Sequence, residues 1–248
     1  MENIIGFFGG DSQVGTTMTA WSFAERLSGN NKKVLFLFGS GENDQAYFSA
    51  ESGSSMDDLK AQLRSGWVER DDLFSLLAKR KNLWILPGTK DSLGADYFPE
   101  NTFEVLLSNV LKDFDYVVID GGHNVRLGVT ISALNVCDCR YFLITQQAKT
   151  LHRFLQCKKN LLAPLGLNGE IIINKYRRDP SLFLKKDVAS MVEEDRLYTL
   201  PYVENGWNQE MERRNLLSSI AFTKAIDSLI KSFVVKEKKV KKWKNPFV

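Results

Sequence analysis

Short apolar runs recur along the whole chain, separated by stretches in which apolar and polar residues mix. Most of the runs are almost uninterrupted instead of alternating with polar residues, a pattern typical of parallel strands that are covered on both faces. The sequence therefore predicts a largely parallel sheet. We expect its strands at Ile4–Phe8, Val34–Phe38, Leu83–Leu86, Tyr116–Ile119, Tyr141–Ile144, Glu170–Ile173 and Tyr198–Leu200.

Amphipathic segments of helical periodicity lie between these runs. Strands and helices that alternate from start to finish favour an α/β fold, with a doubly wound, mostly parallel sheet of about seven strands and helices on both faces. The expected helices are Thr17–Leu27, Asp57–Ser65, Phe103–Leu111, Val129–Val136, Thr150–Leu162, Leu182–Glu194 and Leu217–Phe233.

The composition is that of an ordinary globular protein. Of the 248 residues, 44% are hydrophobic and 25% are charged, which excludes a disordered or fibrous chain. No apolar run is long enough for a spanning helix, and the first residues lack the features of a signal peptide. The three cysteines, Cys137, Cys139 and Cys157, form no CxxC pair. These features favour a cytoplasmic protein.

Positive charge is concentrated at the C-terminal end. Residues 236–248 carry six lysines and one glutamate, a net charge of +5, whereas the whole chain carries only +3, so the rest carries −2. We therefore expect one domain at 1–235 and a basic tail at 236–248. Phe233, Val240 and Phe247 recur every seven residues, so the tail could form an amphipathic helix at an anionic membrane surface. A disordered tail and an arm that binds nucleic-acid phosphates are the alternatives.

The loop after the first expected strand carries the strongest chemical signal. In a parallel sheet, ligands bind beyond the carboxyl ends of the strands, and a glycine-rich turn into a helix can direct backbone N–H groups at an anion. Residues 10–17 read GDSQVGTT, which keeps the glycine spacing and final threonine of the phosphate-binding motif GxxxxGK[ST] but not its lysine. A tight turn with Thr16 or Thr17 as N-cap is the alternative.

Five segments, in register over nearly all of residues 1–235, resemble the MinD/ParA family of deviant Walker ATPases, which includes proteins of the TadZ/CpaE type. They begin with IIGFFGGDSQVGTTMTAWSFAERLSGNNKKVLFLF, followed by NLWILPGTKD, FDYVVIDGGHN, IIINKYRRD and YTLPYVENGWNQEMERRNLL. The resemblance implies a P-loop NTPase-like, Rossmann-like three-layer fold that binds ATP or ADP with Mg²⁺.

The resemblance also implies the site residues. Thr17 and Asp120 would serve the metal, although an aspartate that ends a buried strand can also simply cap the next segment. Asn174, Pro201 and Tyr202 would flank the base. The phosphates would lie against Gly10, Asp11, Ser12, Gln13, Val14, Gly15, Thr16, Thr17 and Met18.

The sequence departs from the family pattern at the residues that carry charge. In the motif KGGxGK[ST], Asp11 and Thr16 occupy the two lysine positions, and Phe38 and Ser40 occupy the positions of an Asp-x-Asp pattern after the second strand. Losing one phosphate-binding lysine costs roughly 1.5–3 kcal/mol. An aspartate about 4 Å from a phosphate adds repulsion on the order of 4 kcal/mol before screening. We therefore expect little or no ATP hydrolysis.

These observations favour a pseudo-ATPase that acts in localisation, partition or the assembly of pili or secretion systems. An active but atypical ATPase and a DNA-binding partition factor that uses the basic tail are the alternatives. The resemblance implies a homodimer and protein partners, with a peripheral position at the inner membrane face if the tail binds lipid. Arg213 and Arg214 are candidates to replace the lost positive charge.

Overall fold

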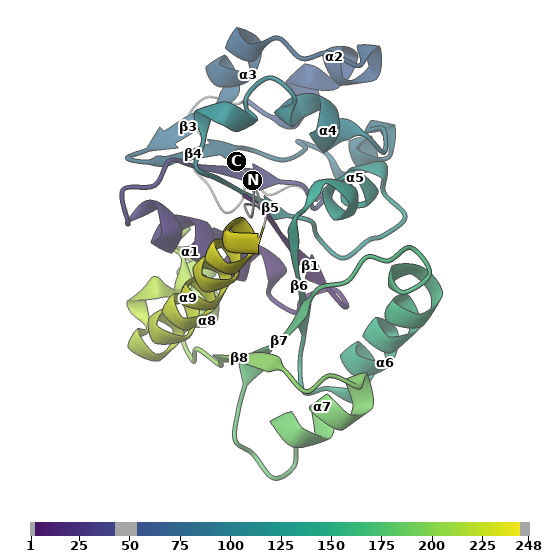
Figure 1. Cartoon of the computed structure of the whole chain (residues 1–248), viewed down its shortest axis with the longest axis vertical. Coiled ribbons are helices and arrows are strands. Elements are labelled where there is room, and N and C mark those ends of the chain that lie inside the picture. The colour runs from purple at the N-terminus through teal and green to yellow at the C-terminus, as the bar shows by residue number, and fades with distance from the viewer. Residues whose placement is uncertain (1–2, 43–53, 244–248) are drawn as a thin grey trace.

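The computed structural model describes residues 3–42 and 54–243, and side chains within this part are described as far as residue 234. Its centre is one sheet of eight strands, most of which are labelled in Figure 1. The strands are β1 (Ile4–Gly9), β2 (Val34–Phe38), β3 (Ala78–Arg80), β4 (Leu83–Leu86), β5 (Tyr116–Asp120), β6 (Cys139–Ile144), β7 (Glu170–Tyr176) and β8 (Leu197–Pro201).

The strand order is β3-β4-β2-β5-β1-β6-β7-β8, and every neighbouring pair is parallel except β3 with β4. The mostly parallel sheet is thus confirmed, with one strand more than the seven expected. The additional strand, β3, is a short edge strand whose residues Lys79 and Arg80 are exposed. A three-residue polar segment carries no apolar run, so the pattern could not reveal it.

Helices cover both faces of the sheet (Figure 1). The helices α1 and α9 pack on one face, whereas α2 to α7 contribute to the core on the other. Their bounds are α1 (Thr16–Ser28), α2 (Lys60–Ser65), α3 (Arg70–Leu76), α4 (Thr102–Leu107), α5 (Gly128–Val136), α6 (Ala148–Cys157), α7 (Lys185–Val192), α8 (Gly206–Met211) and α9 (Ile220–Trp243). Short turns of 3-10 helix occur at η2 (Met56–Leu59), η3 (Ser92–Tyr97), η4 (Leu111–Asp113) and η6 (Leu216–Ser218), and α6 continues into a π-helical turn, η5 (Lys158–Leu162).

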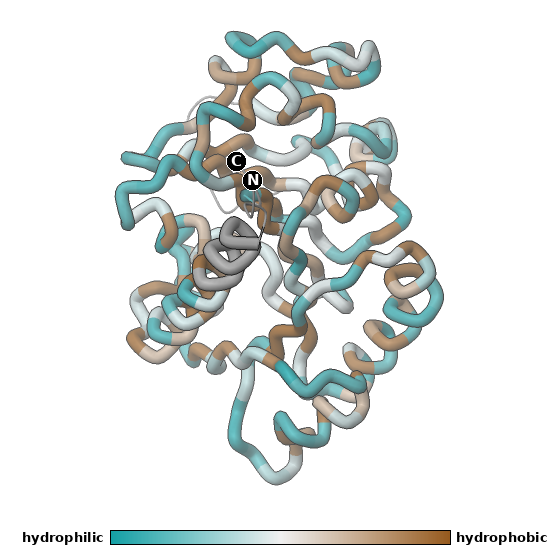
Figure 2. Tube along the Cα trace, in the orientation of Figure 1, coloured by the Kyte–Doolittle hydropathy of each residue, from teal (hydrophilic) through white to brown (hydrophobic). Residues whose placement is uncertain are grey.

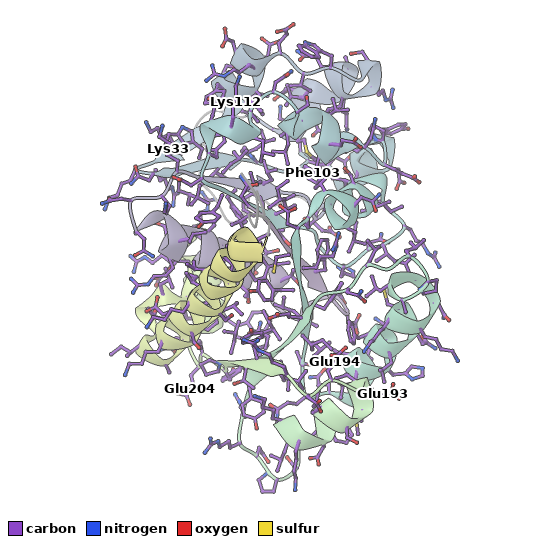
Figure 3. All side chains as sticks on the ribbon, viewed as in Figure 1. Lys33, Phe103, Lys112, Glu193, Glu194 and Glu204 are labelled. Atoms are coloured by element: carbon purple, nitrogen blue, oxygen red, sulfur yellow. The ribbon has the colours of Figure 1, made fainter. Side chains whose placement is uncertain are left out.

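The apolar runs are explained by this three-layer packing. Successive residues of β1 enter opposite cores, because Ile4 and Phe8 pack on the α5–α6 side and Ile5 and Phe7 on the α1–α9 side. Hydrophobic colouring accordingly follows the central strands in Figure 2. Figure 3 shows Phe103, which is fully buried, inside the molecule, whereas Lys112 and other labelled charged residues project outward.

All seven expected helices are present, but some boundaries differ. The helices α3 and α8 were not expected, because each is a single short element of mixed polarity. Helix α9 continues to Trp243, past the boundary expected at residue 235, and residues 244–248 lie outside the described residues. Within the described part of the chain, no helix combines the length and apolar character needed to span a bilayer.

The aromatic cluster between β1, β6 and α1 provides a test of the packing. The rings of Phe7 and Phe23 lie 5.1 Å apart between centroids, and Tyr141 stacks on Phe7 at 5.2 Å. Replacing the fully buried Phe23 by alanine is expected to lower the free energy of unfolding by about 3–5 kcal/mol, measured by urea denaturation. The matched truncation of exposed Leu165 should change it by no more than about 0.5 kcal/mol. Equal effects of both substitutions would contradict this packing.

Candidate functional site

The loop between β1 and α1 forms the centre of the site. At its start it still pairs with both neighbouring strands, because Gly9 N donates to Gly122 O at 2.7 Å and Gly10 N donates to Leu143 O at 2.7 Å. At its end the backbone curls through positive φ angles at Gln13 (58°) and Gly15 (87°). The loop therefore leaves the sheet edge as an open turn at the carboxyl end of the central strand.

Glycine is required at position 15 for two reasons. Its φ of 87° is unfavourable for other residues, and an added Cβ would lie 2.6 Å from the Asn174 amide nitrogen. Gly15 is also the N-cap residue of α1, so it offers no side chain to cap the helix. The alternative in which Thr16 or Thr17 is the N-cap is therefore wrong. The first-turn N–H groups of α1 lack a side-chain cap, the arrangement with which helices bind anions.

Two side chains of strand β7 donate hydrogen bonds to backbone carbonyls of this loop. The pairing of β7 with β8 shifts register between Ile173 and Tyr176, and Lys175 within this bulge has a φ of 54°. The bulge turns two consecutive side chains toward the loop. Asn174 Nδ2 donates to Val14 O at 2.8 Å, and Lys175 Nζ donates to Gln13 O at 2.8 Å.

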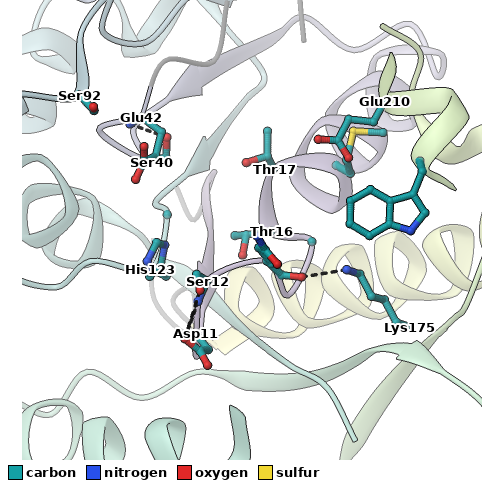
Figure 4. Close-up of a pocket in the computed structure, with 15 residues that line it drawn as sticks. Asp11, Ser12, Thr16, Thr17, Ser40, Glu42, Ser92, His123, Lys175 and Glu210 are labelled. Carbon is teal, nitrogen blue, oxygen red and sulfur yellow. Dashed lines mark hydrogen bonds between the residues drawn. The ribbon is translucent and has the colours of Figure 1, made fainter. Parts of the chain in front are cut away.

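A cavity of about 550 Å³ opens above the loop. Figure 4 shows it bounded by the loop, by the segments that follow β2 and β5, and by α8. Its volume falls within the range of small-molecule sites, about 300–1,000 Å³. Its lining residues are Asp11, Ser12, Gln13, Gly15, Thr16, Thr17, Met18, Ser40, Glu42, Ser92, Gly122, His123, Lys175, Trp207 and Glu210.

Asp11 is held by α6. Its side chain is only 4% exposed, forms an ion pair with Arg153, and accepts a hydrogen bond from Ser12 N at 2.8 Å; Lys149 Nζ lies 4.0 Å away. Burial raises the pKa of this carboxyl, but the hydrogen bonds from Arg153 and Ser12 and the two positive charges outweigh burial and leave the pKa below its ordinary value. The negative charge at position 11 is thus largely compensated within the chain.

The charges that remain at the cavity are mostly negative. Among the described residues that line it, Lys175 is the single lysine or arginine, whereas Glu42 and Glu210 are acidic. Burial lowers the pKa of Lys175, and the charge of Glu210 partly opposes this effect. The Lys175 ammonium lies 5.5 Å from the centre of the Trp207 ring.

Asp120 ends β5 directly beneath the loop and is fully buried. Its Oδ1 accepts a hydrogen bond from Gly122 N at 3.2 Å, whereas its Oδ2 has no hydrogen-bond partner of good geometry among the described residues. Burial raises its pKa to about 6, although the Thr17 hydroxyl and Gly122 N–H act in the opposite direction. A buried carboxylate oxygen without a partner is costly unless a cation or water satisfies it.

These groups fit a magnesium ion that is held together with a phosphate. Thr17 lines the cavity, and Asp120 lies behind it with one unsatisfied oxygen. Mg²⁺ binds through few protein oxygens and completes its coordination with water and substrate phosphates. Within the described residues, no three His, Cys, Asp or Glu side chains converge as a metal site of their own. A metal at this site would therefore depend on the oxygens of a ligand.

A second cavity of about 310 Å³ adjoins the first. The two share Gly15, Met18, Lys175, Trp207 and Glu210. The remaining wall is largely apolar and aromatic, which suits a flat ring system. It consists of Asn174, Pro201, Tyr202, Val203, Gly206, Leu216 and Phe222.

The structure brings most of the predicted site residues together. Ser40 also lines the first cavity, whereas Phe38 packs in the core against Phe36. Gly10 and Val14 shape the loop from behind and do not line either cavity. Of the residues expected at the phosphates, those that line the first cavity are Asp11, Ser12, Gln13, Gly15, Thr16, Thr17 and Met18, and the residues expected at the base, Asn174, Pro201 and Tyr202, line the second.

Arg213 and Arg214 do not replace the missing charge. Both are exposed and outside the two cavities, and Arg214 pairs with Glu212 at 3.2 Å. Sequence reasoning instead missed seven residues that line the first cavity, which come from the segments after the strands, from β7 and from α8. Only the crowding of small and polar residues after the strands hinted at some of them. They are Glu42, Ser92, Gly122, His123, Lys175, Trp207 and Glu210.

No protein-family model matches the sequence, and none of the curated proteins compared with it does either. The structure, in contrast, matches solved structures over nearly its whole length. MinD of Pyrococcus horikoshii OT3, solved with Mg-ADP, is 16% identical with a TM-score of 0.77, and the match covers 95% of this chain and 99% of that one. The fold of this chain is that of the MinD and ParA ATPases.

Two further structures support this fold. A ParA family ATPase of Chlorobium tepidum TLS is 17% identical with a TM-score of 0.76, and the match covers 91% of this chain and 96% of that chain. The MinC:MinD cell division protein complex of Aquifex aeolicus is 16% identical with a TM-score of 0.75, and the match covers 93% of this chain and 96% of that chain. The MinD/ParA fold thus includes proteins that bind Mg-ADP and assemble with a partner.

The burial of Asp120 predicts a characteristic dependence of stability on pH. Because its pKa is raised to about 6, the carboxyl favours the folded state below its unfolded pKa, and this contribution is lost as the pH rises through 6. Asp120→Asn should therefore gain stability relative to wild type between pH 5 and pH 8, by about 1.4 kcal/mol, because one pH unit separates pH 5 from this pKa; urea denaturation at both pH values measures the change.

The comparison between the two pH values removes any constant effect of the substitution. Asp96→Asn, at an exposed position, serves as the control and should show a much smaller pH-dependent change. A difference between Asp120→Asn and wild type that stays the same from pH 5 to pH 8 would contradict an ionisable, buried carboxyl at this site.

Proposed function

We propose that this protein binds ATP or ADP with Mg²⁺ in its first cavity and hydrolyses ATP slowly or not at all. The observation that carries the proposal is a loop that lines a cavity and leads into an uncapped helix N-terminus, but has Thr16 at the lysine position and Asp11 in an internal ion pair. The N-terminus of α1, the first cavity and the buried carboxyl of Asp120 suit the binding of a nucleotide. The charges suit its hydrolysis poorly.

Phosphoryl transfer depends on positive groups that neutralise the transferred phosphoryl. Here one cation, Lys175, lines the cavity among the described residues, and it faces Glu42 and Glu210 across the same space. An active but atypical ATPase would need cations from a second chain or from a partner protein. This second candidate therefore depends on an interaction that brings arginine or lysine to the cavity.

Each element of the site has a separate task. The uncapped first turn of α1 would bind the phosphates through its N–H groups, and the Thr17 hydroxyl would hold Mg²⁺ with Asp120 behind it. The bound Mg²⁺ would supply the positive charge that stabilises the phosphates. Asn174, Pro201 and Tyr202 would flank the base in the second cavity.

The cellular role that we propose is localisation, partition or the assembly of pili or secretion systems, as in proteins of the TadZ/CpaE type, from a cytoplasmic position. The MinC:MinD complex, in which MinD shares the fold, supports a role that works through partners. A homodimer is included in the proposal. In such a dimer Asp11 would not reach across to a second copy, because Arg153 of its own chain holds it.

Nucleotide titration with a lysine restored at position 16 tests this proposal. Wild type should bind ATP or ADP in the presence of Mg²⁺ by calorimetry, while phosphate release stays near background. Thr16→Lys should tighten ATP binding about 10- to 100-fold, because a charged hydrogen bond to phosphate contributes roughly 1.5–3 kcal/mol.

Ser190→Lys adds the same charge at an exposed position of α7 and should leave ATP binding within twofold of wild type. Rapid steady-state hydrolysis by the wild-type chain would overturn the pseudo-ATPase proposal. Unchanged affinity in Thr16→Lys would show that position 16 does not face the phosphates.

We also propose that the basic tail binds anionic membrane. Helix α9 runs through Trp243, so the backbone of the tail is helical over the residues that carry lysines 236, 238, 239, 241 and 242. Each lysine near an anionic surface contributes about 1 kcal/mol, and Trp243 is a residue type that favours the membrane interface. This proposal is independent of nucleotide binding.

Liposome co-sedimentation of the full chain and a variant that ends at residue 235 tests the tail. The full chain should sediment with vesicles containing phosphatidylserine, and the truncated chain should stay in solution. Neither protein should sediment with neutral vesicles, and 0.5 M NaCl should release the full chain from the anionic vesicles. If the full chain ignores anionic vesicles but shifts DNA in a salt-sensitive way, the tail serves nucleic-acid binding instead.

A further inference from the structure

Lys175 holds a position that no other basic side chain of the described site shares. It lines both cavities, at the junction between the loop and the apolar wall. Its ammonium donates to Gln13 O at 2.8 Å. An ammonium has three N–H donors, so this hydrogen bond leaves two for other acceptors on the cavity side.

Other positive groups near the loop are already paired or point elsewhere. Arg153 forms an ion pair with Asp11, and Lys149 lies 4.0 Å from the same carboxylate. Both belong to α6, and neither lines either of the two cavities described above. The positive charge of α6 is thus used to neutralise Asp11, and Lys175 is what remains for a ligand.

From this placement, and resting on the proposed function, we infer that Lys175 binds the phosphates of the nucleotide and replaces the lysine that the loop lacks. The charge reaches the phosphates from β7 instead of from the loop itself. Lys175 is therefore a ligand-binding residue whose charge, and not only its hydrogen bond to the loop, sets the affinity.

The surroundings of Lys175 strengthen its attraction for an anion. The Trp207 ring lies 5.5 Å from the ammonium and covers part of it, and burial lowers the pKa of the group. An ammonium that is partly removed from water attracts a phosphate more strongly than an exposed one, because the local dielectric is lower. The negative charge of Glu210, which also lines both cavities, raises this pKa and so favours the charged form of Lys175.

The experiment compares ATP affinity, with Mg²⁺ present, between wild type and three variants of the full chain by calorimetry. Lys175→Met should weaken ATP binding at least tenfold, and its affinity should fall less steeply with NaCl concentration than that of wild type, because one charge is missing. Lys175→Arg keeps the charge and should stay within about threefold of wild type. Lys186→Met removes a lysine at an exposed position of α7 and should change nothing.

Thermal unfolding of each variant accompanies the titrations, since Lys175 also contacts the loop. Equal ATP affinity in wild type and Lys175→Met would overturn the inference while leaving the proposed function intact. Equal losses of ATP affinity in Lys175→Met and Lys175→Arg, with unchanged salt dependence, would also overturn the inference. That result would show that Lys175 only maintains the shape of the loop. A wild-type chain that binds neither ATP nor ADP would overturn the proposed function, and the inference with it.

Discussion

The two hydrogen bonds from β7 to the loop after β1 are the constraint on which the site depends. A chain that leaves a central strand and enters a helix has many ways to close, and most of them would fill the space above the sheet. Here Asn174 and Lys175 donate to the adjacent carbonyls of Val14 and Gln13. These bonds satisfy the loop carbonyls on the outside, so the loop keeps its open shape and the cavity above it persists.

The charge of the loop is also changed by its contacts with the rest of the chain, because Asp11 is paired with Arg153 of α6. An aspartate in a phosphate-binding loop would repel a nucleotide by several kcal/mol if it faced the cavity alone. Its pairing with Arg153 removes most of that penalty, so the replacement at position 11 is compatible with binding. The replacement at position 16 has no such compensation within the loop, because Thr16 is neutral. In the proposed function, binding and hydrolysis would therefore be affected unequally, since hydrolysis needs charge at the transferred group and binding can draw on the helix N-terminus.

The fold was largely predictable from the sequence because local signals and packing agree. Apolar runs identified seven of the eight strands, and the central ones are buried on both faces, whereas β3 has no such run and was missed. The loop was recognisable because residues 10–17 keep the glycine spacing and the final threonine of the phosphate-binding motif. The electrostatics of the site was not predictable. Asp11 and Arg153 are 142 residues apart, and no local pattern connects them.

The position of Lys175 illustrates the same limit. In a regular strand, neighbouring side chains point to opposite faces, so Asn174 and Lys175 could not both be assigned to the loop. The bulge between Ile173 and Tyr176 breaks that alternation, and a bulge is set by pairing with β8, not by local propensity. Sequence reasoning could identify the residue types at the strand ends. It could not identify which of them converge.

The fixed loop also restricts how a nucleotide could act as a signal. A ligand shifts a conformational equilibrium only as far as its affinity differs between the two states. The bonds that shape the loop are intramolecular, so the loop itself provides little such difference. Segments that line the cavity but are less tied to the core are better placed to respond. Helix α8 is one, because Trp207 lines both cavities while 61% of its surface stays exposed. A ligand that contacts Trp207 would therefore also change what α8, which buries none of its residues, presents at the outer surface.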